Sequence, residues 1–100
     1  MYRTIPETSD DEFEHIMDAR RSAIRFLERT GGYGPIVIKE KKRGVEGEVV
    51  RRREPVTNKF AWIFITSKGH MHIINRDGTL TVTFINHAEV TNIETEEQTA

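Results

Sequence analysis

Two hydrophobic patterns divide this chain. Between residues 10 and 30 apolar side chains recur every three or four positions, and after residue 35 they recur at every second position. The first spacing is typical of an amphipathic helix and the second of half-buried β-strands. We therefore predict an α+β fold in which an N-terminal amphipathic helix precedes a five- or six-stranded antiparallel sheet or small barrel.

The predicted helix runs from about Asp10 to Thr30. Ser9 and Glu12 have the spacing of a capping box, and Gly31-Gly32 provides a stop. Its apolar face consists of Phe13, Ile16, Met17, Ala23, Ile24 and Leu27. Arg20 interrupts this face. We favour an interpretation in which the aliphatic stem of Arg20 packs on the apolar face while its guanidinium reaches water at the edge of that face. The alternative is that the guanidinium binds a buried carboxylate or a ligand anion.

Six segments have strand composition and are bounded by turn residues. They are residues 35–42, 48–56, 60–67, 70–76, 79–86 and 90–94. Aromatic residues alternate with isoleucines through 60–65, so this strand is predicted to be central and covered on both faces. Residues 60–76 fit either one bent strand or a hairpin, which decides between a barrel and an open sheet. Residues 1–6 and 95–100 are expected to be frayed.

The composition is that of an ordinary soluble domain. The 100 residues are 36% hydrophobic and 31% charged, with a net charge of -1, so we expect one domain covering residues 1–100. The lack of cysteine excludes a disulfide scaffold and a thiolate zinc site. No apolar run has the length of a membrane span or a signal peptide. We expect a cytoplasmic protein with no membrane partner.

The charges are unevenly distributed, with acidic ends and a basic middle. The segment 39-KEKKRGVEGEVVRRREP-55 is predicted to form a hairpin whose outer part is charged on both faces. Such a part cannot be buried, so we expect it to stand clear of the core as an arm. Its bases are Lys39, Lys41, Lys42, Arg43, Arg51, Arg52 and Arg53.

Two functions of different class remain open for this arm. In the first, the arm and the helix residues Arg21, Arg25 and Arg29 contact the phosphates of RNA or DNA, with Tyr33 as the one exposed aromatic nearby. In the second, the arm or an edge strand binds an acidic protein, as in an inhibitor or assembly subunit, or the acidic termini of another copy in a homo-oligomer. The charges could also simply protect a strand edge.

Catalytic chemistry has no positive signal in this sequence. A nucleophile elbow and a glycine-rich phosphate loop are both missing, so we expect a non-enzyme without a cofactor. His70 and His72 lie two apart on one strand, a geometry that metals use, and His15 and His87 could complete a set. Because no carboxylate lies at a suitable spacing, we interpret the pair as surface histidines and expect no metal.

The segment 80-LTVTFINHAEVTNIE-94 and the order of the elements resemble the Sm-like small β-barrels of the Hfq type. The resemblance lies in an apolar strand that runs through a His-Ala turn into a final short strand. It implies a ring oligomer that binds RNA at subunit junctions, with His87 as the carried-over site residue. The sequence departs from that family at Asn86, where a lysine is expected, and at Ile85, where an aromatic is expected.

Overall fold

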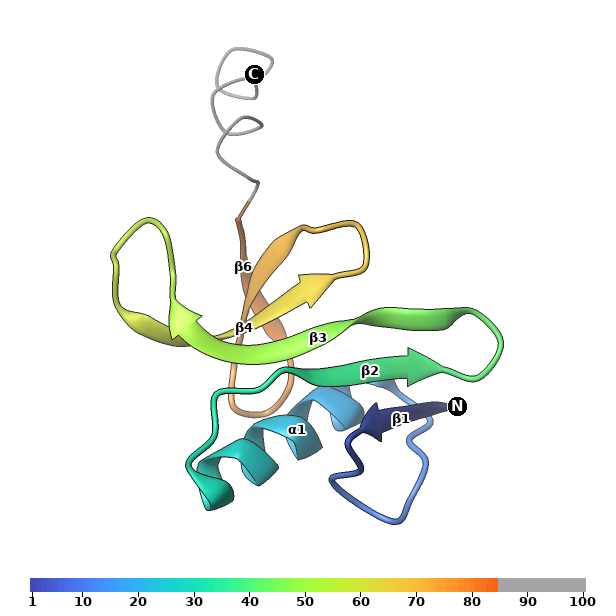
Figure 1. Cartoon of the computed structure of the whole chain (residues 1–100). Coiled ribbons are helices and arrows are strands. Elements are labelled where there is room, and N and C mark those ends of the chain that lie inside the picture. The colour runs from blue at the N-terminus through green and yellow to red at the C-terminus, as the bar shows by residue number, and fades with distance from the viewer. Residues whose placement is uncertain (85–100) are drawn as a thin grey trace.

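The computed structural model of the chain describes residues 1–84 and contains one helix, α1 (Ile16–Thr30), packed on a six-stranded sheet (Figure 1). The strands are β1 (Tyr2–Ile5), β2 (Ile36–Glu40), β3 (Gly44–Arg53), β4 (Phe60–Thr66), β5 (Met71–Ile74) and β6 (Leu80–Phe84). Each pairs antiparallel with its neighbour in sequence, so the described strands form an open meander from β1 to β6. The α+β class is confirmed, whereas the barrel alternative is wrong and residues 60–76 form a hairpin.

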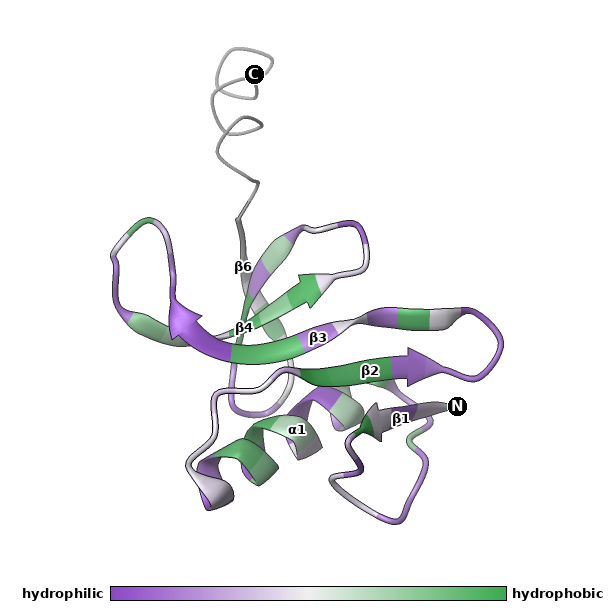
Figure 2. Ribbon diagram, in the orientation of Figure 1, coloured by the Kyte–Doolittle hydropathy of each residue, from purple (hydrophilic) through white to green (hydrophobic). Residues whose placement is uncertain are grey.

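The hydrophobic core lies between α1 and one face of the sheet. Figure 2 shows apolar stretches of β2 and β3 passing directly above α1. The core side chains are Ala19, Ala23, Ile24 and Leu27 of the helix with Ile36, Ile38, Val49, Trp62, Phe64 and Ile74 of the strands. Burying these surfaces stabilises the fold by roughly 25 cal/mol for each Å² of apolar area removed from water. No helix within residues 1–84 is long and apolar enough to cross a membrane.

Strand β4 is apolar on both faces, as its sequence predicts. Trp62 and Phe64 pack toward α1, while Ile63 on the opposite face is fully buried. Successive side chains of a strand point to opposite faces, so the alternation of residue types follows directly from the strand geometry. The exception is Phe60, at the start of the strand, whose side chain is largely exposed.

The helix begins six residues later than predicted, and the capping box does not form. The backbone of Phe13 pairs with Tyr2 instead, through N···O distances of 2.6 and 2.7 Å. This pairing needs an extended backbone at Phe13, so the helix begins at Ile16 with His15 as its N-cap. The Ser9 hydroxyl accepts a hydrogen bond from the Asp11 amide at 3.1 Å rather than capping α1. The predicted end of the helix at Gly31 is confirmed.

The expectation of a frayed N-terminus is also wrong. Residues Tyr2–Ile5 form strand β1, which pairs with β2 from Tyr2↔Glu40 to Ile5↔Val37. Its Thr4 side chain is buried, and the Thr4 hydroxyl accepts the amide proton of Thr8 at 2.8 Å. Edge pairing with β2 and these local hydrogen bonds together supply the contacts that a short terminal segment ordinarily lacks.

Arg20 does not reach the edge of the core, so the favoured interpretation is wrong. Only 8% of the residue is exposed, and its Nε donates to the Gly78 carbonyl at 2.9 Å. The guanidinium carbon lies 5.0 Å from the centre of the Phe64 ring. Burial lowers the pKa of Arg20. Among residues 1–84 its partners are thus a carbonyl and a ring, and no carboxylate forms an ion pair with it.

Candidate functional site

The bases of the predicted arm fall into two groups at opposite ends of β3. The register pairs Glu40 with Gly44 and Ile36 with Val49, which makes residues 41–43 the turn. Arg51, Arg52 and Arg53 therefore lie beyond the base of the hairpin, paired with β4. At about 3.3 Å per residue, Gly44 and Arg52 are roughly 26 Å apart. The prediction that these arginines face the lysines across one arm is wrong.

The first group surrounds the β2–β3 turn. Its tip, Lys41 and Lys42, is exposed, but the turn is held by the buried Glu40 carboxylate. That carboxylate accepts the amide protons of Lys42 and Arg43 at 2.8 and 2.7 Å and pairs with the Met1 ammonium at 3.2 Å. The two amide hydrogen bonds, with the smaller effect of the ammonium, lower the pKa of Glu40 to about 2. This end is a fixed turn flanked by β1 rather than a free arm.

Replacing Glu40 with glutamine is expected to lower the Tm near neutral pH. Because its folded-state pKa lies below its ordinary value of 4.5, ionised Glu40 stabilises the fold above about pH 4.5, and this contribution is lost as the pH falls toward 2. The difference in Tm between wild type and Glu40→Gln should therefore shrink across that interval, as followed by circular dichroism. Glu7→Gln, which removes an exposed carboxylate, is the control. A difference that does not change with pH would contradict this role.

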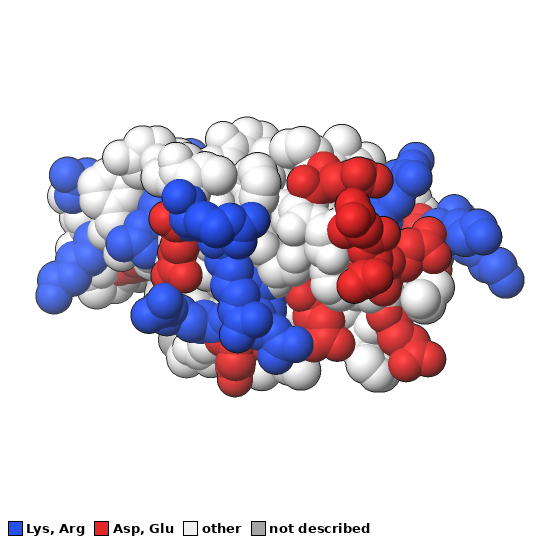
Figure 3. Space-filling model, turned by 90° about the horizontal axis from the view of Figure 1, so that it is seen from below, with Lys and Arg blue, Asp and Glu red and all other residues white. Residues whose placement is uncertain are grey.

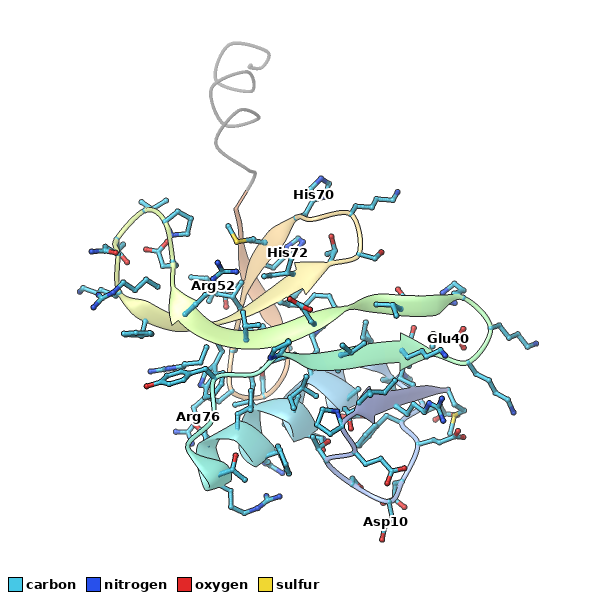
Figure 4. The ribbon with its side chains drawn as sticks, viewed as in Figure 1. Asp10, Glu40, Arg52, His70, His72 and Arg76 are labelled. Carbon is cyan, nitrogen blue, oxygen red and sulfur yellow. The ribbon has the colours of Figure 1, made fainter. Side chains whose placement is uncertain are left out.

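The second group combines arginines with aromatic rings on the side of the sheet that carries α1. The Arg51 guanidinium lies 4.8 Å from the centre of the Trp62 ring, and that of Arg53 lies 4.8 Å from the centre of the Phe60 ring. Arg52 points to the opposite face, above β3 in Figure 4. Only two of the three consecutive arginines therefore share this surface, as the two-residue period of a strand requires.

The connection between α1 and β2 places Tyr33 beside these arginines. Gly31, at φ 72°, ends the helix, and the Tyr33 carbonyl accepts the amide proton of Arg51 at 2.8 Å. Gly34 lies so close to β3 that a Cβ there would be 2.5 Å from the Val49 carbonyl oxygen. The rings of Tyr33 and Phe60 consequently stack with centres 6.2 Å apart and an interplanar angle of 28°. Tyr33 is exposed as predicted, but Phe60 accompanies it, so the expectation of a single exposed aromatic is wrong.

The β5–β6 turn adds Arg76, a basic residue outside the predicted arm and helix. Arg76 reaches Glu28 of α1 with a nitrogen to oxygen distance of 3.0 Å. The groove between this turn, the end of α1 and β3 has a volume of about 430 Å³. It is lined by Leu27, Glu28, Gly31, Gly32, Tyr33, Arg51, Trp62 and Arg76. No local pattern marks Arg76 as part of a site, because its position depends on how the turn docks on α1.

The helix arginines continue this basic surface. Arg21 and Arg25 line a shallow hollow together with Glu28, Arg76 and Asp77, next to the groove. Arg29 lies beside them, with its guanidinium 5.6 Å from the centre of the Phe26 ring. We use the name arginine track for the connected set of Arg21, Arg25, Arg51, Arg53 and Arg76. The structure thus joins two of the three predicted helix arginines, Arg21 and Arg25, to two of the predicted arm residues. It leaves Lys39, Lys41, Lys42, Arg43 and Arg52 apart from them.

The charges on the face that carries α1 are separated. Figure 3 shows the largest group of basic side chains left of centre and the largest group of acidic side chains right of centre, with some acidic side chains among the basic ones and further basic side chains at the right edge. The acidic group belongs to the loop before α1, where Asp10, Asp11, Glu12 and Glu14 are exposed. A chain with a net charge of -1 therefore still presents a strongly basic region at one end.

The histidines do not form a metal site with other described residues. Within residues 1–84 no group of three or more His, Asp or Glu side chains is arranged to hold an ion. His70 is exposed, while His72 is half-buried and burial, followed by the charges of His70 and Arg20, lowers its pKa. The carried-over residue His87, the final part of the Sm-like segment and the predicted strand at 90–94 lie outside the described residues.

Comparisons with known proteins do not assign this chain to a family. No protein-family model matches it, and no curated protein or solved structure is significantly similar.

Proposed function

We propose that this protein binds nucleic acid through the arginine track. The observation that carries the proposal is the stacking of Arg51 and Arg53 over the rings of Trp62 and Phe60. A guanidinium held on a ring keeps its N–H groups at its edge, where they can bind two phosphate oxygens at once. Among residues 1–84, no carboxylate forms an ion pair with either of these arginines, so the rings do not neutralise them. Arg53 Nη1 also donates to the Asn58 carbonyl at 2.8 Å, which helps to orient this guanidinium and leaves its other N–H groups for a phosphate.

The surrounding charges favour a polyanion rather than a single anion. The arginine track runs from α1 across the β5–β6 turn to the end of β3. Two of its arginines are paired with acids, Arg21 with Asp18 at 2.7 Å and Arg76 with Glu28 at 3.0 Å, and Asp77 also lines the hollow. An extended series of cations matches the regular phosphates of a nucleic-acid backbone. The acidic loop at the other half of the same face would repel a polyanion, so binding is directed to one end of the molecule.

The double variant Arg51→Ser/Arg53→Ser tests the proposal. We expect it to weaken binding of labelled RNA and DNA oligonucleotides about tenfold or more, as measured by fluorescence anisotropy at low salt. The matched control is Lys42→Ser/Arg52→Ser, which removes the same charge from residues outside the arginine track. We expect the control to change the Kd by less than about twofold.

Two outcomes would refute the proposal. One is an absence of binding to both RNA and DNA at low salt, which would leave an acidic protein surface as the ligand of the arginine track. The other is an equal loss of affinity in both double variants, because total charge rather than the stacked arginines would then determine binding.

A further inference from the structure

The Tyr33–Phe60 ring pair is an exposed aromatic surface at the rim of the groove. Tyr33 is 64% exposed and Phe60 is 49% exposed, whereas Trp62 and Phe64 on the same face of β4 are buried. Water-exposed rings stacked on each other gain little of the stability that full burial would provide. Both rings therefore keep exposed surface on which a planar ligand could stack.

The backbone, rather than the Tyr33 side chain, fixes this part of the chain. The Tyr33 carbonyl is bonded to the Arg51 amide, and Gly34 packs directly against β3. Within residues 1–84 the Tyr33 hydroxyl makes no hydrogen bond. The ring is therefore held at a fixed place on the surface by contacts that would remain if the ring were changed.

We propose that the Tyr33–Phe60 pair is a stacking site for an unpaired nucleobase, so that the nucleic acid bound by this protein is single-stranded. The inference rests on the proposed function: Arg51, Arg53 and Arg76 bind phosphates while a base lies on the exposed ring of Tyr33. The faces of a base within a duplex are covered by its neighbours in the stack, and its edges are reached only through the grooves. An exposed ring at a rim can therefore stack only on a base that has left a duplex or was never paired.

The same geometry predicts little preference for sequence. Every base offers a π-face, and neither the ring pair nor the guanidinium groups around it read the pattern of donors and acceptors at a base edge. Arg53 over the Phe60 ring places a cation beside the ring pair, where it could bind a phosphate of the same strand. The expected ligand is thus a single strand of RNA or DNA of any sequence.

Substitutions at Tyr33 separate stacking from charge. For a single-stranded oligo(dT) of about 12 nucleotides, we expect Tyr33→Ala and Tyr33→Leu to raise the Kd about tenfold, and Tyr33→Phe to change it by less than about twofold. Leucine keeps much of the apolar volume but has no π-face. Tyr33→Leu therefore tests stacking even if Tyr33→Ala lowers the Tm. The matched control is Val56→Ala, which removes an exposed apolar side chain from the β3–β4 connection and should leave the Kd unchanged.

The readout is fluorescence anisotropy with the single strand and with a duplex of the same length, at equal salt. The inference is supported if the wild type binds the single strand more tightly and the Tyr33 variants lose that preference. It is overturned if the duplex binds as tightly, or if Tyr33→Leu binds the single strand like the wild type. In either of those cases a loss of binding in Arg51→Ser/Arg53→Ser would still uphold the proposed function, whereas an absence of all binding would overturn both.

Discussion

Replacing Gly78 with alanine is expected to destabilise the protein by about 3 kcal/mol or more. Gly78 has a φ of 95°, and a Cβ there would lie 2.1 Å from the Met17 carbonyl oxygen. The obstacle is backbone, so no side chain can rotate away to relieve it. Gly78 also presents the carbonyl that accepts the hydrogen bond from Arg20, and displacing the turn would leave that buried guanidinium without its acceptor.

Gly69→Ala is the matched control for this substitution. Gly69 has nearly the same backbone conformation, with a φ of 91°, but a Cβ there would meet nothing within 4 Å. Gly69→Ala should destabilise the protein only by the cost of placing alanine at a positive φ, which is about 1 kcal/mol. Urea unfolding of the two variants would measure the difference, and equal losses would show that the contact with Met17 contributes little. Since the same turn carries Arg76, Gly78→Ala should also weaken nucleic-acid binding.

The parts of the fold that follow from local chemistry could be predicted from the sequence. Gly31 ends the helix because glycine adopts a left-handed conformation at little cost, and the alternation at 60–65 requires a strand with two apolar faces. The start of the helix could not be predicted, because Phe13 pairs with Tyr2 of strand β1, which lies outside the predicted helix. A good capping box at Ser9 is outweighed by that tertiary pairing.

The candidate site was harder to predict because it depends on strand register. Gly44 and Gly47 both suit a turn, and a turn that spans them would align the lysines with the arginines. In the structure the turn precedes Gly44, whereas Gly47 lies within β3, where a Cβ would be 2.5 Å from the Ile65 carbonyl oxygen and 2.7 Å from the Phe64 ring. Gly47 is thus a packing residue. This difference in register separates Lys41 from Arg51 and places the arginines beside β4.

A second reason is that the arginine track and the aromatic rings beside it come from elements far apart in the chain. Tyr33 follows the helix, Phe60 begins β4, and Arg76 lies in the turn after β5. Each of these residues alone is an ordinary surface residue with no motif around it. Only the docking of Gly34 on β3 and of Gly78 on α1 brings them to one groove. Sequence spacing contains no information on either contact.

Binding of a single strand should weaken about a hundredfold when salt rises from about 50 to about 200 mM, provided that about five phosphates contact the arginine track. The cause is the release of condensed counterions. The logarithm of the binding constant then falls with the logarithm of salt with a slope of about -0.7 for each phosphate neutralised on a single strand. Anisotropy titrations over this range would give the slope directly.

The slope of this salt dependence distinguishes phosphate contacts from base stacking better than the affinity at one salt concentration does. Arg51→Ser and Arg53→Ser should each reduce its magnitude by about 0.7, because each removes one phosphate contact. Arg52→Ser should leave it unchanged, since Arg52 lies on the other face of β3. Tyr33→Leu should lower the affinity at every salt concentration while keeping the slope, because stacking releases no counterions. If Arg52→Ser reduced the slope as much as Arg51→Ser, the phosphates would be bound by diffuse charge and not by the arginine track.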